Sequence, residues 1–387
     1  MTVHNKTLLQ NKYLLDEAKA LQDAGFIFKE HYSNIKKELP DFKSNHNWLL
    51  RIAFLLLGSF LYSSICGFVM LTILQATGEH FEVLFFIFTL IGIAGTEFFA
   101  RQNYFGHGLD DAFIIGFQIC IAATIGIITS GDEFLIAITI TTSATLCYLR
   151  YLHRSMLLIA CVAATASIFY GILNLGAKTA AILPFVSMVF AVLLFMVWNK
   201  KLQHTATFYK FDVDLIRYYS YLLFYVSGNY LVVRELSVVL LKQAINPGQD
   251  IPFAWFFYFF SFIVPVGYIY QALQQKNKII LWMGAAALAF SIYSIRFYYA
   301  VLPLELALTF GGLFLFGVTY LLIKKLQNQT TGITFKPDRF SNSTPFQAAE
   351  IIVASQVSAV QTNQQAVDSP MEFGGGGYSG GGASGEY

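Results

Sequence analysis

Residues 52–76 read IAFLLLGSFLYSSICGFVMLTILQA, a run without one charged side chain. The hydrocarbon core of a bilayer is about 30 Å thick and an α-helix rises 1.5 Å per residue, so about 20 apolar residues are enough to cross it. This segment therefore predicts a transmembrane helix, and the chain repeats the pattern.

Nine more apolar runs of similar length follow this first one. They cover residues 81–100, 112–129, 134–149, 155–174, 180–198, 215–238, 252–271, 279–295 and 302–323. Hydrophobic residues make up 56% of the chain and charged residues only 12%, against about 25% in soluble domains. Because apolar spans satisfy their backbone groups internally as helices, the fold class is predicted to be all-α, a polytopic bundle of about ten transmembrane helices over residues 51–325.

The distribution of Lys and Arg between the predicted spans gives an orientation. Ten such residues fall in loops on the amino-terminal side and three in the opposite loops, while the first 51 residues add eight more. Positive loops are retained in the cytoplasm. Ten spans therefore predict that both termini are cytoplasmic.

A small soluble headpiece, residues 1–50, precedes the first span. Apolar residues recur at helical spacing over residues 6–23, and Gly25 supplies a stop. A second short helix follows and ends at Pro40, so the pair predicts a cytoplasmic helical hairpin. It is either a packing element beside the membrane or a module that binds a cytoplasmic protein partner. The late start of the first long apolar run leads us to expect no cleaved leader.

Residues 326–387 are predicted to form a disordered polar and glycine-rich tail, with one short helix candidate at residues 346–357. The tail contains a formal G-x-S-x-G match at residues 377–381. A nucleophilic serine of that motif needs a strand before it and a helix after it, and glycine repetition supplies neither. Ser379 is therefore not expected to be catalytic.

The hairpin segment from Ala24 to Ile27, the many spans, and a last span containing Gly311 and Gly312 form an order of elements. This order resembles bacterial predicted membrane proteins catalogued as domains of unknown function. The tail is similar to the glycine-rich ends of several bacterial membrane proteins, some of which carry a TPM domain that has no counterpart here. The resemblance implies a multi-pass protein of the bacterial inner membrane and brings no active site.

Polar residues at membrane depth are costly and point to a pathway or a helix contact. The seventh predicted span has Ser227, Gly228, Asn229 and Tyr230 at its centre, and the eighth contains Pro265. Transporters use such breaks to expose backbone groups to a substrate. Small residues and one Asn equally allow close helix packing, so both interpretations stay open.

A second candidate set lies near the predicted outer face. These charged residues either line a vestibule or complement the dipoles of helix ends. The candidates are Arg234, Glu235, Arg296 and Glu305, with Glu82, Asp132, Glu133 and Lys178 near them.

On the opposite side, Glu97 and Arg101 have the spacing of an ion pair, and Asp110 has the position of a helix N-cap. His107 with Asp111 would need a third ligand to hold a metal. The four cysteines lie singly inside apolar runs and are interpreted as buried hydrophobes. No nucleotide, haem or metalloprotease motif occurs, so no metal, no cofactor and no catalytic residue is predicted.

Three functions remain compatible with this sequence. The first is a membrane scaffold or accessory protein, in contact with the lipid bilayer, whose cytoplasmic ends bind partners. The second is a secondary transporter with a midplane site between two inverted five-helix halves. The third is an intramembrane enzyme whose site would assemble from distant spans. The net charge of +2, without any basic stripe, argues against nucleic-acid binding.

Overall fold

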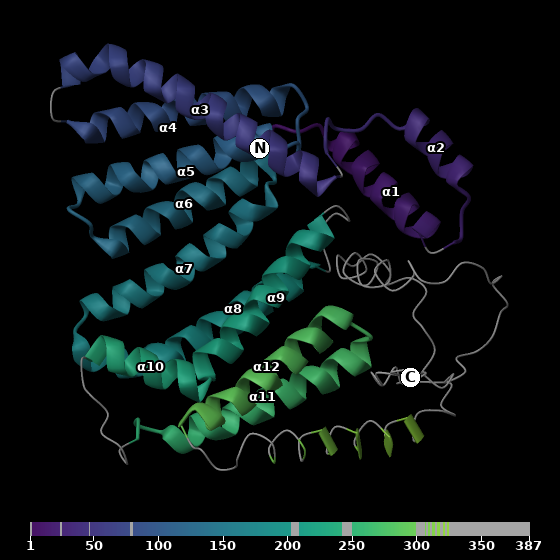
Figure 1. Cartoon of the computed structure of the whole chain (residues 1–387), viewed down its shortest axis with the longest axis vertical. Coiled ribbons are helices and arrows are strands. Elements are labelled where there is room, and N and C mark those ends of the chain that lie inside the picture. Colours follow the sequence, from purple (N-terminus) through teal and green to yellow (C-terminus); the bar gives the residue numbers. More distant parts are fainter. Residues whose placement is uncertain are drawn as a thin grey trace, which may run out of the picture. The chain divides into compact units, whose positions relative to one another are not determined.

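The computed structural model describes residues 2–23, 25–45, 47–77, 80–202, 209–241 and 250–298, with ten further positions between Leu306 and Lys324. This described part is helical and contains no β-strand (Figure 1). Its helices are α1 (Lys6–Asp23), α2 (Lys29–Glu38), α3 (Trp48–Thr77), α4 (Phe81–Arg101), α5 (Leu109–Ile128), α6 (Glu133–Tyr151), α7 (Arg154–Asn174), the 3-10 helix η1 (Ala177–Ile182), α8 (Leu183–Leu202), α9 (Lys210–Gly228), α10 (Tyr230–Leu241), α11 (Ala254–Gln275) and α12 (Lys278–Tyr298).

The headpiece contains the two predicted helices, α1 and α2, which lie side by side in Figure 1. Gly25 has a φ of 77°, a conformation that glycine adopts without strain. The N–H groups of Gly25 and Phe26 donate to the carbonyls of Gln22 and Leu21, both at 2.9 Å. The predicted helix stop at Gly25 is thus confirmed. Asn11 of α1 donates to the carbonyl of Pro40 at 3.0 Å and ties the two ends of the hairpin together.

Backbone hydrogen bonds fix the headpiece to the end of α6 and to the loop between α4 and α5. Val3 N–H donates to the Arg150 carbonyl at 3.0 Å, and Lys43 N–H donates to the Asn103 carbonyl at 2.9 Å. The imidazole of His4 is buried and makes edge contacts with Phe42 and Phe105, each with ring centroids 5.2 Å apart. The first residues of the chain are therefore part of the packed structure.

Among the described residues, six helices are long and apolar enough to cross a membrane, namely α3, α4, α5, α6, α7 and α11. A seventh span is possible if α9 and α10, which meet at 66°, are counted together. The apolar parts of α8 and α12 are shorter, at Leu183–Val197 and Lys278–Ser294. These helices cover the first nine predicted segments, whereas most of the tenth, residues 302–323, lies outside the described residues, as does the whole predicted tail.

Large apolar side chains cover the outside of these helices. On α3, Phe60 is 74% exposed and Leu71 is 80% exposed. Water would make such exposure unfavourable over a whole helix, whereas lipid accepts it. Together with the span lengths, this establishes a multi-pass integral membrane protein.

Small residues bring the first membrane helices together. A Cβ placed on Gly92 of α4 would lie 2.5 Å from Phe117 Cβ of α5, and one on Gly95 would lie 2.3 Å from the Phe113 ring. These two glycines let α4 and α5 approach at backbone distance, as small residues do in membrane helix pairs. Cys66, Cys120, Cys147 and Cys161 are free and buried, as their apolar surroundings in the sequence indicate.

Polar residues at the ends of several helices meet on one side of the bundle. Glu97 accepts hydrogen bonds from Arg101 at 3.0 Å, from Arg150 at 2.7 Å and from the Tyr151 hydroxyl at 3.1 Å. The predicted pair of Glu97 and Arg101 is confirmed, and Arg150 joins it from the last turn of α6. Arg154 Nε lies 3.4 Å from Asp212 at the start of α9.

Candidate functional site

The break between α9 and α10 lies at the residues that the sequence singled out. Asn229 leaves the helical conformation with a ψ of 126° and is completely buried. Its Oδ1 accepts the N–H groups of Leu231 at 3.0 Å and Val232 at 3.4 Å. Asn229 therefore acts as the N-cap of α10 and replaces the helical bonds that the break removes.

The remaining polar atoms of Asn229 bind neighbouring side chains. Its Nδ2 donates to the hydroxyl of Tyr225 at 2.9 Å, and Ser294 of α12 donates to its Oδ1 at 3.3 Å. Tyr225 in turn donates to the carbonyl of Ala287 at 2.6 Å. The break is thus bonded to α12 through three buried side chains.

Pro265 creates a second gap in the backbone bonding, inside α11. Proline has no N–H, so the carbonyl four residues earlier, that of Ser261, loses its helical donor. Ser291 Oγ of α12 donates to this carbonyl at 2.5 Å. Ser261 Oγ also accepts the N–H of Tyr230, the first residue of α10, at 3.0 Å. Ser261 therefore connects the two gaps. Its carbonyl bonds to Ser291 of α12, and its hydroxyl bonds to the first residue of α10.

Close packing accompanies these hydrogen bonds. A Cβ on Gly228 would lie 2.2 Å from the Phe260 ring and 2.5 Å from Met188 Cε. Ser227 donates to the Leu223 carbonyl within its own helix, at 2.7 Å. The arrangement joins α8, α9, α10, α11 and α12 through buried contacts.

The charged candidates beside the break have different environments. Arg234 donates to the hydroxyl of Tyr230 at 2.6 Å and lies 3.9 Å from Asp250. The Tyr230 hydroxyl also donates to Asp250 at 2.6 Å. Glu235 on α10 and Arg296 on α12 are exposed, and Glu305 lies outside the described residues. The sequence reasoning missed Asp250, which precedes α11 and carries no motif.

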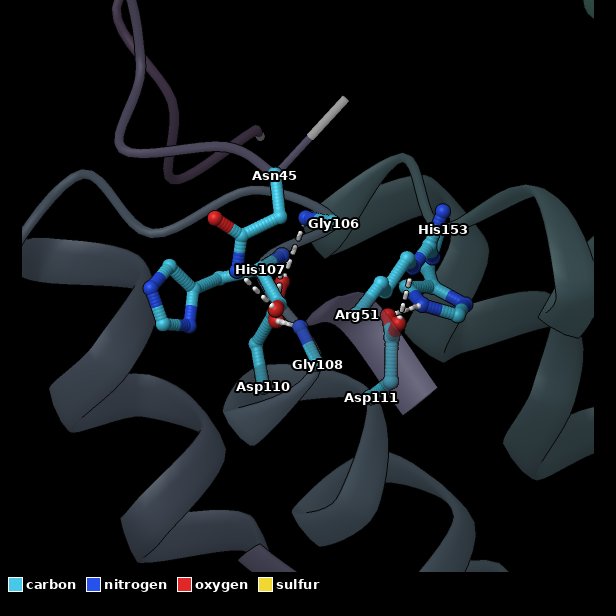
Figure 2. A network of polar contacts seen from close by, with 8 residues as sticks. All are labelled: Asn45, Arg51, Gly106, His107, Gly108, Asp110, Asp111 and His153. Atoms are coloured by element: carbon cyan, nitrogen blue, oxygen red, sulfur yellow. Dashed lines mark hydrogen bonds and ion pairs between the residues drawn. The ribbon is translucent and has the colours of Figure 1, made fainter. Parts of the chain in front are cut away.

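A second polar cluster lies at the end of the helices where the headpiece binds (Figure 2). Asp110 accepts the N–H groups of Gly106 at 2.7 Å, His107 at 2.9 Å and Gly108 at 3.0 Å. The prediction that Asp110 is the N-cap of α5 is wrong, because Gly108 holds that position. Asp110 lies in the first turn and reaches back to the preceding loop, where its negative charge meets three backbone donors.

Asp111 is buried and joins three segments. Its carboxylate contacts His153 Nε2 from the loop before α7 and accepts a hydrogen bond from Arg51 Nε of α3 at 2.6 Å. In Figure 2 the His107 side chain points away from Asp111. The His107 ring packs on Phe54, with centroids 4.4 Å apart. Pairing His107 with Asp111 as metal ligands is therefore wrong.

His153 and Arg51 could not be found as partners of Asp111 from the sequence. They lie 42 and 60 residues away from it, and each follows from how separate helices pack. In the described part of the chain no group of three or more His, Cys, Asp or Glu side chains has a geometry suited to a metal ion.

Comparisons with known proteins give no relative for this arrangement. No protein family, no curated protein and no solved structure matches the chain. The site is therefore interpreted from its own geometry.

Proposed function

We propose that this protein is a membrane scaffold or accessory protein of the bacterial inner membrane, with ten spans and both termini in the cytoplasm. The observation that carries the proposal is the headpiece, a helical hairpin fixed to the bundle by backbone bonds such as that from Val3 to Arg150. A hairpin held in one place can present a surface to a partner with a smaller loss of conformational entropy on binding.

The proposed partner surface is the apolar part of the hairpin that remains exposed. Phe28 is 77% exposed and Phe26 is 48% exposed, and both precede α2. Leu14 of α1 is 49% exposed. Exposed aromatic residues are typical anchors in protein interfaces.

Photo-crosslinking in living cells tests this proposal. Benzoylphenylalanine in place of Phe28 should give one discrete adduct with another protein, and the same probe at buried Phe42 should give none. Adding Phe26→Ser should reduce the Phe28 adduct while leaving thermal stability unchanged. A probe at Phe28 that yields no adduct, or the same adducts as Phe42, would contradict a partner on this surface.

A secondary transporter with a midplane site is the second candidate, and the break at Asn229 favours it. Transporters place interrupted helices at their substrate sites. Here, however, the described polar atoms around Asn229 bond to neighbouring helices, and this supports a helix contact. An intramembrane enzyme built on His107 has less support, because that ring packs between Phe54 and Tyr104.

Cysteine accessibility separates the scaffold from the transporter. A single cysteine at Ser227 of a transporter should react with an impermeant maleimide from each side of the membrane in turn. In a scaffold it should stay unreactive from both sides. The native cysteines are buried, so the unsubstituted protein is a suitable control without a reactive thiol.

A further inference from the structure

Two adjoining cavities lie where the headpiece meets α3, α5 and α7. The first has a volume of about 270 Å³ and is lined by Lys12 of α1, Arg51 of α3 and Arg154 at the start of α7. The second has a volume of about 240 Å³, and most of its lining surface is apolar, although Arg51, Asp111, His153 and Ser155 also line it. Arg51, His153 and Ser155 line both, so the cavities adjoin at these residues.

The first cavity gathers positive charge and donors. Arg51 contacts Asp111 through Nε, and Arg154 contacts Asp212 through Nε. These contacts do not use the two Nη groups, which carry four of the five N–H donors of a guanidinium. Burial lowers the pKa of Lys12, and the neighbouring charges of Arg154 and Arg51 act in the same direction, against Asp16 and Asp41.

Two polar atoms of residues lining this cavity have no hydrogen-bond partner among the described residues. Ser44 Oγ and His153 Nδ1 are buried and unbonded. His153 Nε2 already contacts Asp111, so Nδ1 is the remaining nitrogen of a ring whose side chain is 8% exposed. Buried polar atoms normally have partners, and a ligand can supply them.

The first turn of α7 adds a further donor group. Ser155 is the second residue of this helix, after His153 at the N-cap and Arg154. Backbone N–H groups of a first turn have no acceptor within the helix, and the helix dipole there favours an anion.

The second cavity lies beside apolar side chains of a membrane helix. Trp48, Ile52 and Leu55 of α3 line it, together with Ile115 of α5. Trp48 is 67% exposed and Ile52 is 44% exposed, on a helix that is long and apolar enough to span the membrane. An acyl chain could enter this cavity from the side of the bilayer.

We propose that the paired cavities bind one anionic phospholipid, with its phosphate near Lys12, Arg51 and Arg154 and part of an acyl chain against Trp48, Ile52 and Leu55. The polar cavity matches the charge of a phosphodiester, and the apolar cavity matches a hydrocarbon chain. Bound there, the lipid joins the headpiece to the membrane helices. The site lies apart from the exposed surface at Phe28 and does not depend on a protein partner there.

Native mass spectrometry of the full-length protein tests the site with added dioleoyl phosphatidylglycerol. Lys12→Met should weaken retention of this lipid about fivefold, the effect of one cation near a membrane surface. Lys43→Met is the matched control and should change nothing. Both ammonium groups lie 4.9 Å from an aromatic ring, but Lys43 does not line either cavity.

A variant that binds the lipid more tightly gives a test that misfolding cannot imitate. The Asp16 carboxylate lines the first cavity and repels a phosphate, so Asp16→Asn should tighten retention. Ile52→Trp should fill the second cavity and weaken retention without changing the melting temperature of the lipid-free protein.

Three outcomes would overturn the proposal. Equal retention of phosphatidylcholine and phosphatidylglycerol would show that the anionic headgroup is not recognised. Equal effects of Lys12→Met and Lys43→Met on lipid retention would contradict binding in the cavity that Lys12 lines. Displacement of the lipid by inorganic phosphate or glycerol 3-phosphate at equal concentration would assign the cavity to a soluble phosphate instead.

Discussion

At the scale of single residues, Asn229 shows how one amide can replace missing backbone bonds. Its oxygen accepts two N–H groups of α10 and the Ser294 hydroxyl, and its nitrogen donates to Tyr225. Within a membrane, water does not compensate for the loss of such bonds. Asn229 therefore supplies most of the side-chain bonds at this break, and Ser261 accepts the N–H of Tyr230.

Asn229→Leu should lower the free energy of unfolding by about 2 kcal/mol, since it removes both a cap and contacts between helices. Ser227→Ala is the control, because Ser227 bonds only within α9, and it should cost about 0.6 kcal/mol or less. Reversible unfolding in mixed micelles measures both. Equal losses of unfolding free energy for the two variants would mean that Asn229 does not stabilise the break between α9 and α10 more than Ser227 does.

His4 makes the docking of the headpiece on the membrane helices depend on pH. Burial lowers its pKa below the usual 6.5, although the Tyr151 backbone and the charges of Asp110 and Glu97 oppose this. As pH falls, His4 takes up a proton more readily when the headpiece is undocked than when it is docked. The docked headpiece is therefore fully stable above about pH 6.5 and loses stability below it.

The protection of the Val3 and Lys43 amides against hydrogen exchange measures this effect, after correction for the intrinsic exchange rate. Protection should fall between pH 7.5 and pH 5.5 in the unsubstituted protein and stay constant in His4→Leu. His31→Leu, at an exposed position of α2, should retain the decline. A constant protection in the unsubstituted protein would exclude His4 as its source.

Local sequence signals identified some of these residues and not others. Gly25 and the pair of Glu97 and Arg101 depend on neighbours a few residues away, and they are found where expected. Asp111 binds His153 and Arg51, whose positions depend on the packing of three helices. A pattern of spacing within one segment contains no information about such partners.

At the scale of elements, α11 shows a proline compensated by a neighbouring helix. Pro265 leaves the Ser261 carbonyl without its helical donor, and Ser291 of α12 replaces it. The sequence pointed to Pro265 as a break. It could not reveal Ser291, because that serine has no relation to Pro265 until the two helices pack.

A double-mutant cycle can measure this compensation. Ser291→Ala should cost about 1 to 2 kcal/mol, because it leaves a buried carbonyl unpaired. In a Pro265→Ala background the same substitution should cost less, since the alanine N–H can bond Ser261 itself. Unfolding free energies of the four proteins give the coupling, and strictly additive costs would contradict the role assigned to Ser291.

Two helical glycines should respond in opposite directions to alanine. Gly228→Ala places a Cβ against Phe260 and Met188 and should lower stability by about 1 to 3 kcal/mol. Gly267→Ala in α11 meets no atom within 4 Å and should raise stability by about 0.5 to 1 kcal/mol. Melting temperatures compare the pair directly, and a rise for Gly228→Ala would contradict close packing at that residue.

At the scale of the whole molecule, hydropathy located the helices well because the apolar runs, 16 to 25 residues long, are close to the about 20 residues that a bilayer requires. The first nine predicted segments fall on helices of the structure. The break within residues 215–238 divides one apolar run into α9 and α10, and a window of hydropathy averages over such a bend. The count of ten spans stays a prediction.

Labelling of single cysteines tests the orientation. Lys36 of α2 and Leu175 after α7 are separated by five predicted crossings, so they should lie on opposite sides. An impermeant maleimide added to intact cells should label Leu175→Cys and reach Lys36→Cys only after lysis. Labelling of both cysteines in intact cells would contradict the odd number of crossings between them.

The bond from Val3 to Arg150 also has a consequence for the order of assembly. Val3 is synthesised 147 residues before its acceptor, Arg150. At about 5 to 20 residues per second, the Val3 amide waits about 7 to 30 seconds for that acceptor. During this interval the segment around His4 lacks contacts that later residues supply, so chaperones and proteases meet it in an exposed state. A segment made early in synthesis is thus among the later ones to reach its final position.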